Sequence, residues 1–368
     1  MKILHVVTFI DQDRSYGGPV TVAMNLAEEQ VRQGHQVTIF SLAPTSSDRK
    51  AGFSSNGVDF VLFRARHLPF LGAFSSMVSI PSFYWLLSHA KSFDVAHLHF
   101  SRDLFQGLSA RVLGFLKLPV FLQTHGMITN SETKEKRIQN FYDTTFVKPV
   151  LQQARQVFAL QKVELTEIKA KFGIAHVRLL PNGVQMASHE PSKTTESTLV
   201  AFVSRLHPRK NPILFLQCAK RMIESGFTGR FVIAGPDGGL GDQVSQFVSN
   251  FNHPHLEYLG PLSHSDTLSL LKRISVLVLP SRNEPFPMIV LEALSVGTPV
   301  AISRSCQIAD LVVHGGLGVV FDESAEGVEA GIHEVLARNV SRTSILQSAT
   351  QIFGISKVVS ELLKIYDA

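Results

Sequence analysis

The sequence predicts an α/β protein of two domains, each built around a parallel β-sheet. Short apolar runs typical of buried strands alternate with amphipathic segments typical of helices, and this order specifies parallel strands joined by right-handed crossovers. The chain has 368 residues, which is too long for one ordinary hydrophobic core. Residues 185–197 are rich in Ser, Thr, Glu and Pro and are expected to be a linker. The expected domains are residues 1–183 and 184–350, followed by a last helix within residues 351–368.

The first half begins with a strand, a glycine-containing loop, a helix and a second strand. Lys2–Phe9 is the first strand; aspartates follow so closely that a signal peptide is not expected. The loop ends in Gly17 and Gly18, Pro19 opens the helix, and Val37–Leu42 is the second strand. The two glycines either form an ordinary tight turn or let the backbone approach a diphosphate at a helix N-terminus. Their spacing does not match the dinucleotide-binding fingerprint.

The remainder of the first half continues the same alternation. Further strands are expected at residues 58–63, 94–99, 120–124, 157–160 and 177–180. Helices are expected at residues 144–154 and up to residue 172, and the charged segment 131–140 is expected to act as a mobile lid. A turn at residues 181–183 closes this half.

Residues 64–92 form an unusual segment. Apolar and aromatic residues, including the single Trp of the chain, lie between basic residues at its two ends. Two interpretations stay open: a pair of helices buried in the core, or an amphipathic surface that dips into a membrane interface.

Three histidines stand in or directly after expected strands. His97 and His99 lie on one face of their strand, but no second pair of ligands stands at a spacing typical of a metal site, so none is expected. His125 follows the strand at residues 120–124, where a histidine is either structural or part of a binding site.

The second half restarts with a strand at residues 199–204. Arg205 stands at its end, Lys210 lies in the next loop, and Asn211 with Pro212 begins a helix. Two cations beside a helix N-terminus can stabilise a pyrophosphate leaving group without a metal ion. The alternative is a solvated basic loop, and Arg209 is expected to be solvated.

Further strands of the second half end in glycines that open a crevice at the carboxyl edge of the sheet. These strands are expected at residues 231–234 and 256–259, followed by Gly235 and Gly260, and Leu262 lies shortly after the second. Additional strands are expected at residues 274–279 and 299–302, and the last helix at residues 355–366.

The second half is organised around the stretch from Pro280 to Leu294. It follows the apolar strand at residues 274–279, and Pro287 stands where a helix begins. Glu284 therefore lies on the loop after a strand and Glu292 on the following helix, whose first N–H groups can bind an anion or sugar hydroxyls. Each glutamate alone could equally be a solvated surface charge.

These motifs, in this order, resemble glycosyltransferase family 4, the retaining enzymes that use nucleotide-diphosphate sugars. The resemblance rests on Gly17 with Gly18, a Thr-His-Gly strand end at His125, the Arg205–Lys210 spacing, and the eight-residue separation of Glu284 and Glu292. It covers nearly the whole chain. It implies the GT-B fold, with two Rossmann-like domains facing each other across a deep cleft and a last helix that crosses back to the N-terminal domain. The chain departs from many relatives at Pro287 and Met288, where they have Gly and Leu, which leaves the donor sugar open.

The resemblance also implies roles for individual residues. It implies that the acceptor binds to the first domain and the nucleotide-sugar to the second. The catalytic residues would be His125, Arg205, Lys210 and Glu284. Groups that touch the donor would be Gly17, Gly18, Gly235, Leu262, Phe286, Pro287, Met288, Ile289 and Glu292. No cofactor and no metal are expected, and the substrate would be a UDP- or GDP-sugar.

The composition of the chain limits which binding partners and which cellular compartment are expected. Residues 1–185 hold 20 of the 35 Lys and Arg but 13 of the 30 Asp and Glu, so the net positive charge is concentrated there. No nucleic-acid-binding motif is found, so an anionic membrane leaflet is the favoured partner for this charge, together with a saccharide or lipid-linked acceptor. Two cysteines make no disulfide framework, and no apolar stretch reaches the length of a membrane span. We expect a cytoplasmic hexosyltransferase for bacterial surface polysaccharide; the alternatives are a nucleotide-sugar epimerase and a non-catalytic membrane scaffold.

Overall fold

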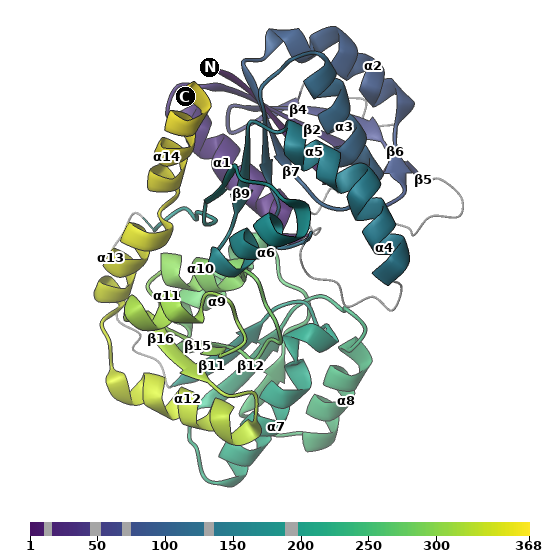
Figure 1. Cartoon of the computed structure of the whole chain (residues 1–368). Helices are drawn as coiled ribbons and strands as arrows, with labels where there is room; N and C mark the ends of the chain where they lie inside the picture. Colours follow the sequence, from purple (N-terminus) through teal and green to yellow (C-terminus); the bar gives the residue numbers. More distant parts are fainter. Residues whose placement is uncertain (11–16, 45–52, 68–74, 129–135, 188–197) are drawn as a thin grey trace. The chain divides into compact units, whose positions relative to one another are not determined.

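The computed structural model describes residues 1–10, 17–44, 53–67, 75–128, 136–187 and 198–368. The chain divides into two compact units (Figure 1). The first unit contains Met1–Gly183 and Ile355–Ala368, and the second contains Val184–Gly354. The final helix thus belongs to the unit in which the chain begins.

The first unit is built on an eight-stranded sheet with the order β10-β9-β8-β7-β1-β2-β4-β3. All neighbouring strands are parallel except the edge pair β3–β4. The strands are β1 Lys2–Phe9, β2 Gln36–Ala43, β3 Phe53–Ser55, β4 Val58–Arg64, β7 Val95–His99, β8 Val120–Gln123, β9 Gln156–Ala159 and β10 Val177–Leu179. A separate antiparallel pair consists of β5 Arg66–His67 and β6 Met77–Val78.

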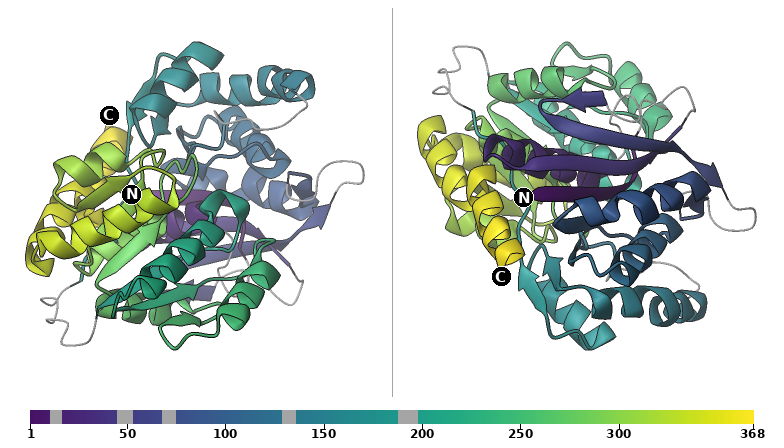
Figure 2. Two further views of the ribbon diagram at one scale, coloured as in Figure 1. Left: turned by 90° about the horizontal axis from the view of Figure 1, so that it is seen from below. Right: turned by 90° about the horizontal axis from the view of Figure 1, so that it is seen from above.

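Helices of the first unit connect and cover these strands. They are α1 Gly17–Arg32, α2 Ile80–His89, α3 Leu104–Phe115, α4 Lys136–Tyr142, α5 Lys148–Gln153, α6 Lys162–Phe172 and α14 Ile355–Asp367, with a short 3-10 turn at Ala90–Ser92. Helix α14 lies beside α1 (Figures 1 and 2), and the Ser356 hydroxyl donates a 2.7 Å hydrogen bond to the Glu29 carboxylate. This contact ties the last helix of the chain to the first.

Burial of the central strands follows from their parallel arrangement. Apart from its first residue, every residue of β1 is buried, and β7 and β8 are buried along their whole length, as expected for strands covered on both faces. The core on one side is aromatic: the ring of Phe40 stacks on Phe105 and on Trp85, with centroids 5.5 and 5.2 Å away. The strand ends that carry the histidines are therefore anchored in a packed core.

The second unit is built on a six-stranded parallel sheet with the order β13-β12-β11-β14-β15-β16. The strands are β11 Leu199–Val203, β12 Arg230–Ala234, β13 Leu256–Tyr258, β14 Val276–Leu279, β15 Val300–Ser303 and β16 Gly318–Phe321. The strand order reverses direction between β11 and β14, the arrangement at which open α/β sheets bind ligands.

Helices cover both faces of this second sheet (Figure 1). They are α7 Pro212–Glu224, α8 Gly241–Phe251, α9 His264–Arg273, α10 Met288–Ser295, α11 Ala309–His314, α12 Ala325–Arg338 and α13 Arg342–Phe353, with a 3-10 turn at Pro208–Lys210. Helices α7 and α12 contact each other, and α10 contacts α9 and α13. The alternation of strands and helices confirms the predicted α/β class for both halves.

Two helix boundaries differ from the sequence-based expectation. Helix α1 begins at Gly17, so the two glycines form its first turn instead of preceding Pro19; residues 11–16 lie outside the described residues. The helix expected at residues 144–154 is interrupted, because Asp143–Val147 forms a π-helical turn before α5. In the expected lid, residues 136–140 belong to α4, while residues 131–135 lie outside the described part of the chain.

The described residues of the segment 64–92 do not form the two buried helices that are one of its two interpretations. Its described residues contain the β5–β6 pair and a single helix, α2, in which Ser82 and Leu86 are buried. Ile80, Tyr84 and Leu87 lie on one face of α2 and are 69, 69 and 47% exposed. No helix within the described ranges is both long enough and apolar enough to cross a membrane.

Candidate active site

The second unit places Lys210 and Glu284 in direct contact. Lys210 closes the 3-10 turn after β11, and Glu284 lies on the loop after β14, the neighbouring strand. The Lys210 ammonium nitrogen lies 2.6 Å from the Glu284 carboxylate, whose residue is 5% exposed. Arg209 is exposed, as expected, and one of its guanidinium nitrogens lies 3.8 Å from the same carboxylate oxygen. Two cations therefore share one buried carboxylate at the carboxyl edge of the sheet.

Backbone hydrogen bonds hold the loop that carries Glu284. The Arg282 N–H donates to the Arg209 carbonyl at 2.8 Å, which joins this loop to the one after β11. The Gln307 N–H donates to the Glu284 carbonyl at 2.9 Å, which fixes the other side. Between them Asn283 adopts a left-handed conformation with φ 48°, which asparagine tolerates better than most residues. The glutamate is thus positioned by its own backbone before any ligand binds.

Gly235 allows the ends of β11 and β12 to approach each other. A Cβ at this position would lie 1.9 Å from the carbonyl oxygen of Ser204, and φ is +148°. The Gly235 N–H donates to the Gly260 carbonyl at 2.9 Å, so the loops after three strands meet here. Arg205 is exposed and its side chain packs along Gly238, where a Cβ would lie 2.8 Å from the Arg205 Cγ. Arg205 thus lies beside the glycine-rich loop after β12.

Glu292 on α10 is a mostly buried carboxylate without a cation beside it. Burial raises its pKa from 4.5 to about 7. Among the described residues, the side chain of Glu292 has no hydrogen-bond or ion-pair partner. A carboxylate in this setting gains most from a ligand that donates hydrogen bonds, such as a pair of hydroxyl groups.

Residues around the start of α10 differ in what they can offer a ligand. Pro287 is the N-cap residue, and the first turn of the helix contains Met288 and Ile289, which are both half-buried. Phe286 is 7% exposed and packs edge-on against Phe353 of α13, with ring centroids 6.1 Å apart. The Phe286 side chain therefore supports the loop from within the unit. Leu262 is half-buried and directly precedes Ser263, the N-cap residue of α9.

In the first unit, His125 occupies a turn with a left-handed backbone. Its φ is 52°, and that of Gly126 is 72°. Glu164 of α6 stabilises this turn: its carboxylate accepts hydrogen bonds from the Thr124 hydroxyl at 2.5 Å, the Gly126 N–H at 2.6 Å and the Leu160 N–H at 2.7 Å. Left-handed non-glycine residues that persist because their surroundings fix them are concentrated at functional sites. The turn thus holds the His125 ring in one place.

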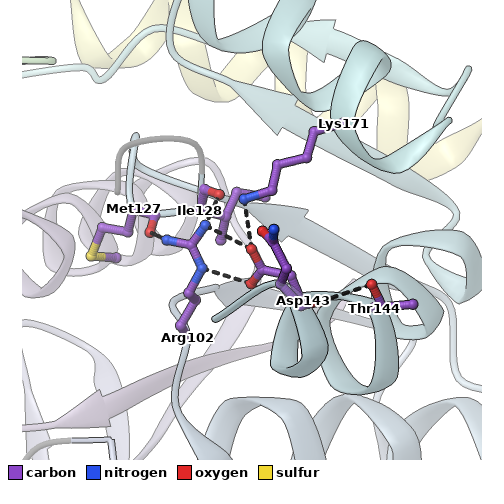
Figure 3. Close-up of polar contacts among 7 residues, drawn as sticks. Arg102, Met127, Ile128, Asp143, Thr144 and Lys171 are labelled. Atoms are coloured by element: carbon purple, nitrogen blue, oxygen red, sulfur yellow. Dashed lines mark hydrogen bonds and ion pairs between the residues drawn. The ribbon is translucent and has the colours of Figure 1, made fainter. Parts of the chain in front are cut away.

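Arg102 fixes the residues that follow this turn (Figure 3). Its guanidinium donates to the Met127 carbonyl at 2.7 Å and to the Ile128 carbonyl. Asp143 accepts from the Arg102 Nε at 2.7 Å and from the Lys171 ammonium at 2.6 Å, so it orients the guanidinium. Side chains from α3's preceding loop, the π-helical turn and α6 thereby converge on one loop.

Sequence reasoning did not identify Glu164, Arg102 or Asp143. Their signals are weak, because a glutamate in the first turn of a helix and an arginine after a strand are common on protein surfaces. Gly17 and Gly18 start α1, so their N–H groups lie in its first turn. No group of three or more His, Cys, Asp or Glu in the described ranges is arranged to hold a metal ion.

Two family models together match most of the chain. Residues 16–188 match the model described as Glycosyltransferase Family 4, and residues 185–351 match the model described as Glycosyl transferases group 1. A similar curated protein is the UDP-Gal:alpha-D-GlcNAc-diphosphoundecaprenol alpha-1,3-galactosyltransferase of Escherichia coli, 29% identical over 246 residues, which are 62% of this chain and 62% of that protein. An uncharacterized glycosyltransferase of Methanocaldococcus jannaschii is 23% identical over 95% of this chain and 92% of its own length.

Solved structures show the same fold. The sucrose-phosphate synthase of Thermosynechococcus elongatus superposes with a TM-score of 0.77 at 17% identity, over 100% of this chain and 98% of that one. Anabaena HepE in complex with UDP and glucose superposes with a TM-score of 0.73 at 16% identity, over 100% of both chains. The chain belongs to family 4 of the glycosyltransferases and has the GT-B fold of two Rossmann-like units.

Proposed function

We propose that the protein is a retaining, metal-independent hexosyltransferase that transfers a sugar from a UDP- or GDP-sugar to a saccharide or lipid-linked acceptor. The observation that carries this proposal is the contact between Lys210 and the buried Glu284 carboxylate at the carboxyl edge of the second sheet. A diphosphate leaving group needs compensating positive charge, and a sugar ring needs firm hydrogen-bond acceptors. Lys210 supplies the positive charge, and Glu284 supplies the hydrogen-bond acceptor directly beside it.

In this proposal the second unit binds the donor. Arg205 and Lys210 neutralise the departing diphosphate, Glu284 accepts hydrogen bonds from sugar hydroxyls, and Glu292 accepts them from the ribose. The unpartnered Glu292 carboxylate supports the last role, because hydroxyl donors would replace the solvation that burial removes. The first-turn N–H groups of α10 lie next to Glu284 in the chain and add weak positive charge.

The chemical step follows from these charges. As the bond between the anomeric carbon and the diphosphate oxygen breaks, the carbon gains positive charge and the leaving oxygen gains negative charge. The acceptor hydroxyl attacks from the same face, and its proton passes to the departing diphosphate oxygen, which retains the configuration. Lys210 and Arg205 favour this step because the charge on the leaving group grows in the transition state. His125 positions the sugar or the acceptor.

The exposed face of α2 supports an acceptor at a membrane surface. Ile80, Tyr84 and Leu87 lie on one side of this helix. Arg64 and Arg66 are exposed in β4 and β5, and Lys91 is exposed after α2. Exposed apolar side chains on a helix, with exposed basic residues before and after it in the chain, suit an anionic leaflet, where each basic residue contributes about 1 kcal/mol. We therefore propose a lipid-linked saccharide on the inner leaflet as the acceptor and a bacterial surface polysaccharide as the product.

Transfer assays with a panel of UDP- and GDP-sugars test the proposed donor site. Glu284→Ala and Lys210→Ala should each lower the transfer rate at least about 100-fold, since each removes a charge placed at the reacting groups. The matched controls are Arg230→Ala and Glu257→Ala, which break an exposed ion pair of the same unit with a 3.1 Å N–O distance. Near-normal transfer in both site variants would refute the site, and donor conversion without any acceptor would favour an epimerase.

A further inference from the structure

Four histidines of the first unit lie side by side on neighbouring strands. His5 is on β1, His97 and His99 are on β7, and His125 follows β8. Because β8, β7 and β1 are neighbours in the sheet and His5 is in register with His97, these rings gather on one face. The ring centroids of His5 and His99 are 5.3 Å apart, and those of His99 and His125 are 5.1 Å apart. All four residues are at least 92% buried.

Three of these rings form a continuous hydrogen-bonded chain with Gln30 of α1. The Gln30 Oε1 lies 2.7 Å from the His5 Nε2. The His5 Nδ1 lies 3.0 Å from the His99 Nε2, and the His99 Nδ1 lies 3.0 Å from the His125 Nε2. Each ring thus uses both nitrogens, except His125. The His125 Nδ1 has no hydrogen-bond partner in the described part of the chain. This atom is not fully enclosed by the protein, so it can bind a ligand.

Each of these rings is neutral at neutral pH. Burial lowers the pKa of His5 to about 4 and that of His125 to about 3, and it places the pKa of His99 well below its usual range. A neutral imidazole has one N–H donor and one lone-pair acceptor. In a chain of such rings, the direction of one hydrogen bond therefore determines the direction of all the others.

We propose that Gln30 sets the tautomer of His125 through His5 and His99. The Gln30 carbonyl oxygen accepts a hydrogen bond, so His5 carries its proton on Nε2 and accepts with Nδ1. His99 must then donate from Nε2 and accept with Nδ1, and His125 must donate from Nε2. The Nδ1 of His125 is left as a hydrogen-bond acceptor. A reversed Gln30 amide would reverse every bond and turn this atom into a donor.

A second group of side chains favours this orientation of the Gln30 amide. The Tyr366 hydroxyl of α14 lies 2.6 Å from the His97 Nδ1. Burial raises the pKa of Tyr366 well above its usual range, and the nearby Gln30 side chain acts in the opposite direction. The Gln30 Nε2 is buried and makes no hydrogen bond among the described residues, so Tyr366 is the group towards which it can turn. If the Gln30 Nε2 points to Tyr366, the Oε1 must point to His5. The Tyr366 hydroxyl then donates to the His97 Nδ1, while the His97 Nε2 makes no hydrogen bond among the described residues.

This inference rests on the proposed function, in which His125 touches the sugar or the acceptor. An acceptor nitrogen at this position can accept a hydrogen bond from a substrate hydroxyl, whereas a donor could bind only the oxygen of that hydroxyl. Gln30 and His99 are positioning residues in this scheme, since they act on the substrate through His125. This chain of hydrogen bonds works with neutral imidazole rings, and burial favours the neutral ring over the charged imidazolium.

Nitrogen NMR of protein labelled with 15N in its 15 histidines tests the tautomer directly. The 15N chemical shift of a ring nitrogen that carries a proton differs greatly from that of a nitrogen that does not. The signals of His125 are identified by their loss in His125→Gln. The wild type should show a proton on the His125 Nε2 and none on Nδ1. Gln30→Met removes the acceptor at nearly constant volume and should yield a mixture of tautomers at His125. The control Gln156→Met, at a buried glutamine on β9 of the same unit, should leave the His125 signals unchanged.

Activity measurements separate this scheme from simple packing. Gln30→Met and His99→Leu should lower kcat about tenfold, the effect of losing one ordinary hydrogen bond, with little change in the donor KM. His99→Gln can accept from His125 and donate to His5, so it should recover most of the loss in His99→Leu. A proton on the His125 Nδ1 in the wild type, or an unchanged His125 tautomer in Gln30→Met, would overturn the inference. Full activity of His125→Gln would instead refute the proposed role of His125, while the NMR result would still decide the relay.

Discussion

Replacing Glu292 by glutamine should stabilise the second unit and weaken donor binding at the same time. Burial raises the pKa of Glu292 from 4.5 to about 7, and each pKa unit corresponds to about 1.4 kcal/mol, so ionisation at pH 8 opposes folding by up to about 3 kcal/mol. Because the pKa of Glu292 is higher in the folded state, the folded protein favours the protonated carboxyl group. This preference stabilises the fold least above pH 7. Its contribution is fully present below pH 4.5 and is lost as the pH rises to 7. Glutamine does not ionise, although its buried amide keeps a desolvation penalty.

Unfolding free energies should therefore differ by about 2 kcal/mol between Glu292→Gln and the wild type at pH 8, and by less than about 1 kcal/mol at pH 5. The single Trp, Trp85, lies in the first unit, so tryptophan fluorescence would not report on this site. Hydrogen exchange measured by mass spectrometry on peptides of Val184–Gly354 resolves the second unit. Glu224→Gln, at a carboxylate that is 57% exposed on α7, is the matched control and should change little.

The second part of this prediction concerns the binding of the donor nucleotide. A carboxylate that accepts hydrogen bonds from ribose hydroxyls contributes about 2 kcal/mol, so Glu292→Gln should weaken UDP or GDP binding at least about tenfold in calorimetry. Equal stabilities of variant and wild type at pH 8 would refute the burial argument. Unchanged nucleotide affinity with increased stability would mean that Glu292 is buried but does not bind the donor.

Three further predictions concern the acceptor unit and the membrane. Glu164→Ala should lower kcat at least about tenfold through loss of the His125 turn, while nucleotide binding, measured by calorimetry, stays near the wild-type value because Glu164 lies in the first unit. A chelator should not change the transfer rate if Arg205 and Lys210 compensate the diphosphate charge; activity lost and then restored by manganese or magnesium would contradict this. In liposome flotation the protein should need anionic lipid and bind less in high salt, and Tyr84→Ser should weaken binding more than Leu179→Ser, a change at another exposed apolar residue. A protein that stays in the soluble fraction with anionic vesicles at low salt would remove the support for a lipid acceptor.

Much of this architecture could be predicted because its signals are local. Strands such as Val276–Leu279 and helices such as Met288–Ser295 follow from apolar runs, prolines and glycines within a few residues of each element. Residues at the ends of parallel strands meet at one edge of a sheet, so the neighbourhood of Lys210 and Glu284 could be anticipated without knowing their distance. The start of α1 and the π-helical turn at Asp143 could not be placed, because tertiary contacts decide such boundaries.

The sequence by itself determined the α/β class, the family and the loops that carry the candidate residues. Only the tertiary structure decided which side chains touch. Gln30, His5, His99 and His125 are spread over about 120 residues of the chain. The sheet order β8-β7-β1 and the packing of α1 against β1 make them neighbours. The exposed face of α2 has the same origin, since only the side of this helix that packs against α3 and the core is buried. Local propensity depends on neighbours along the chain, whereas hydrogen-bond direction, burial and pKa depend on neighbours in space.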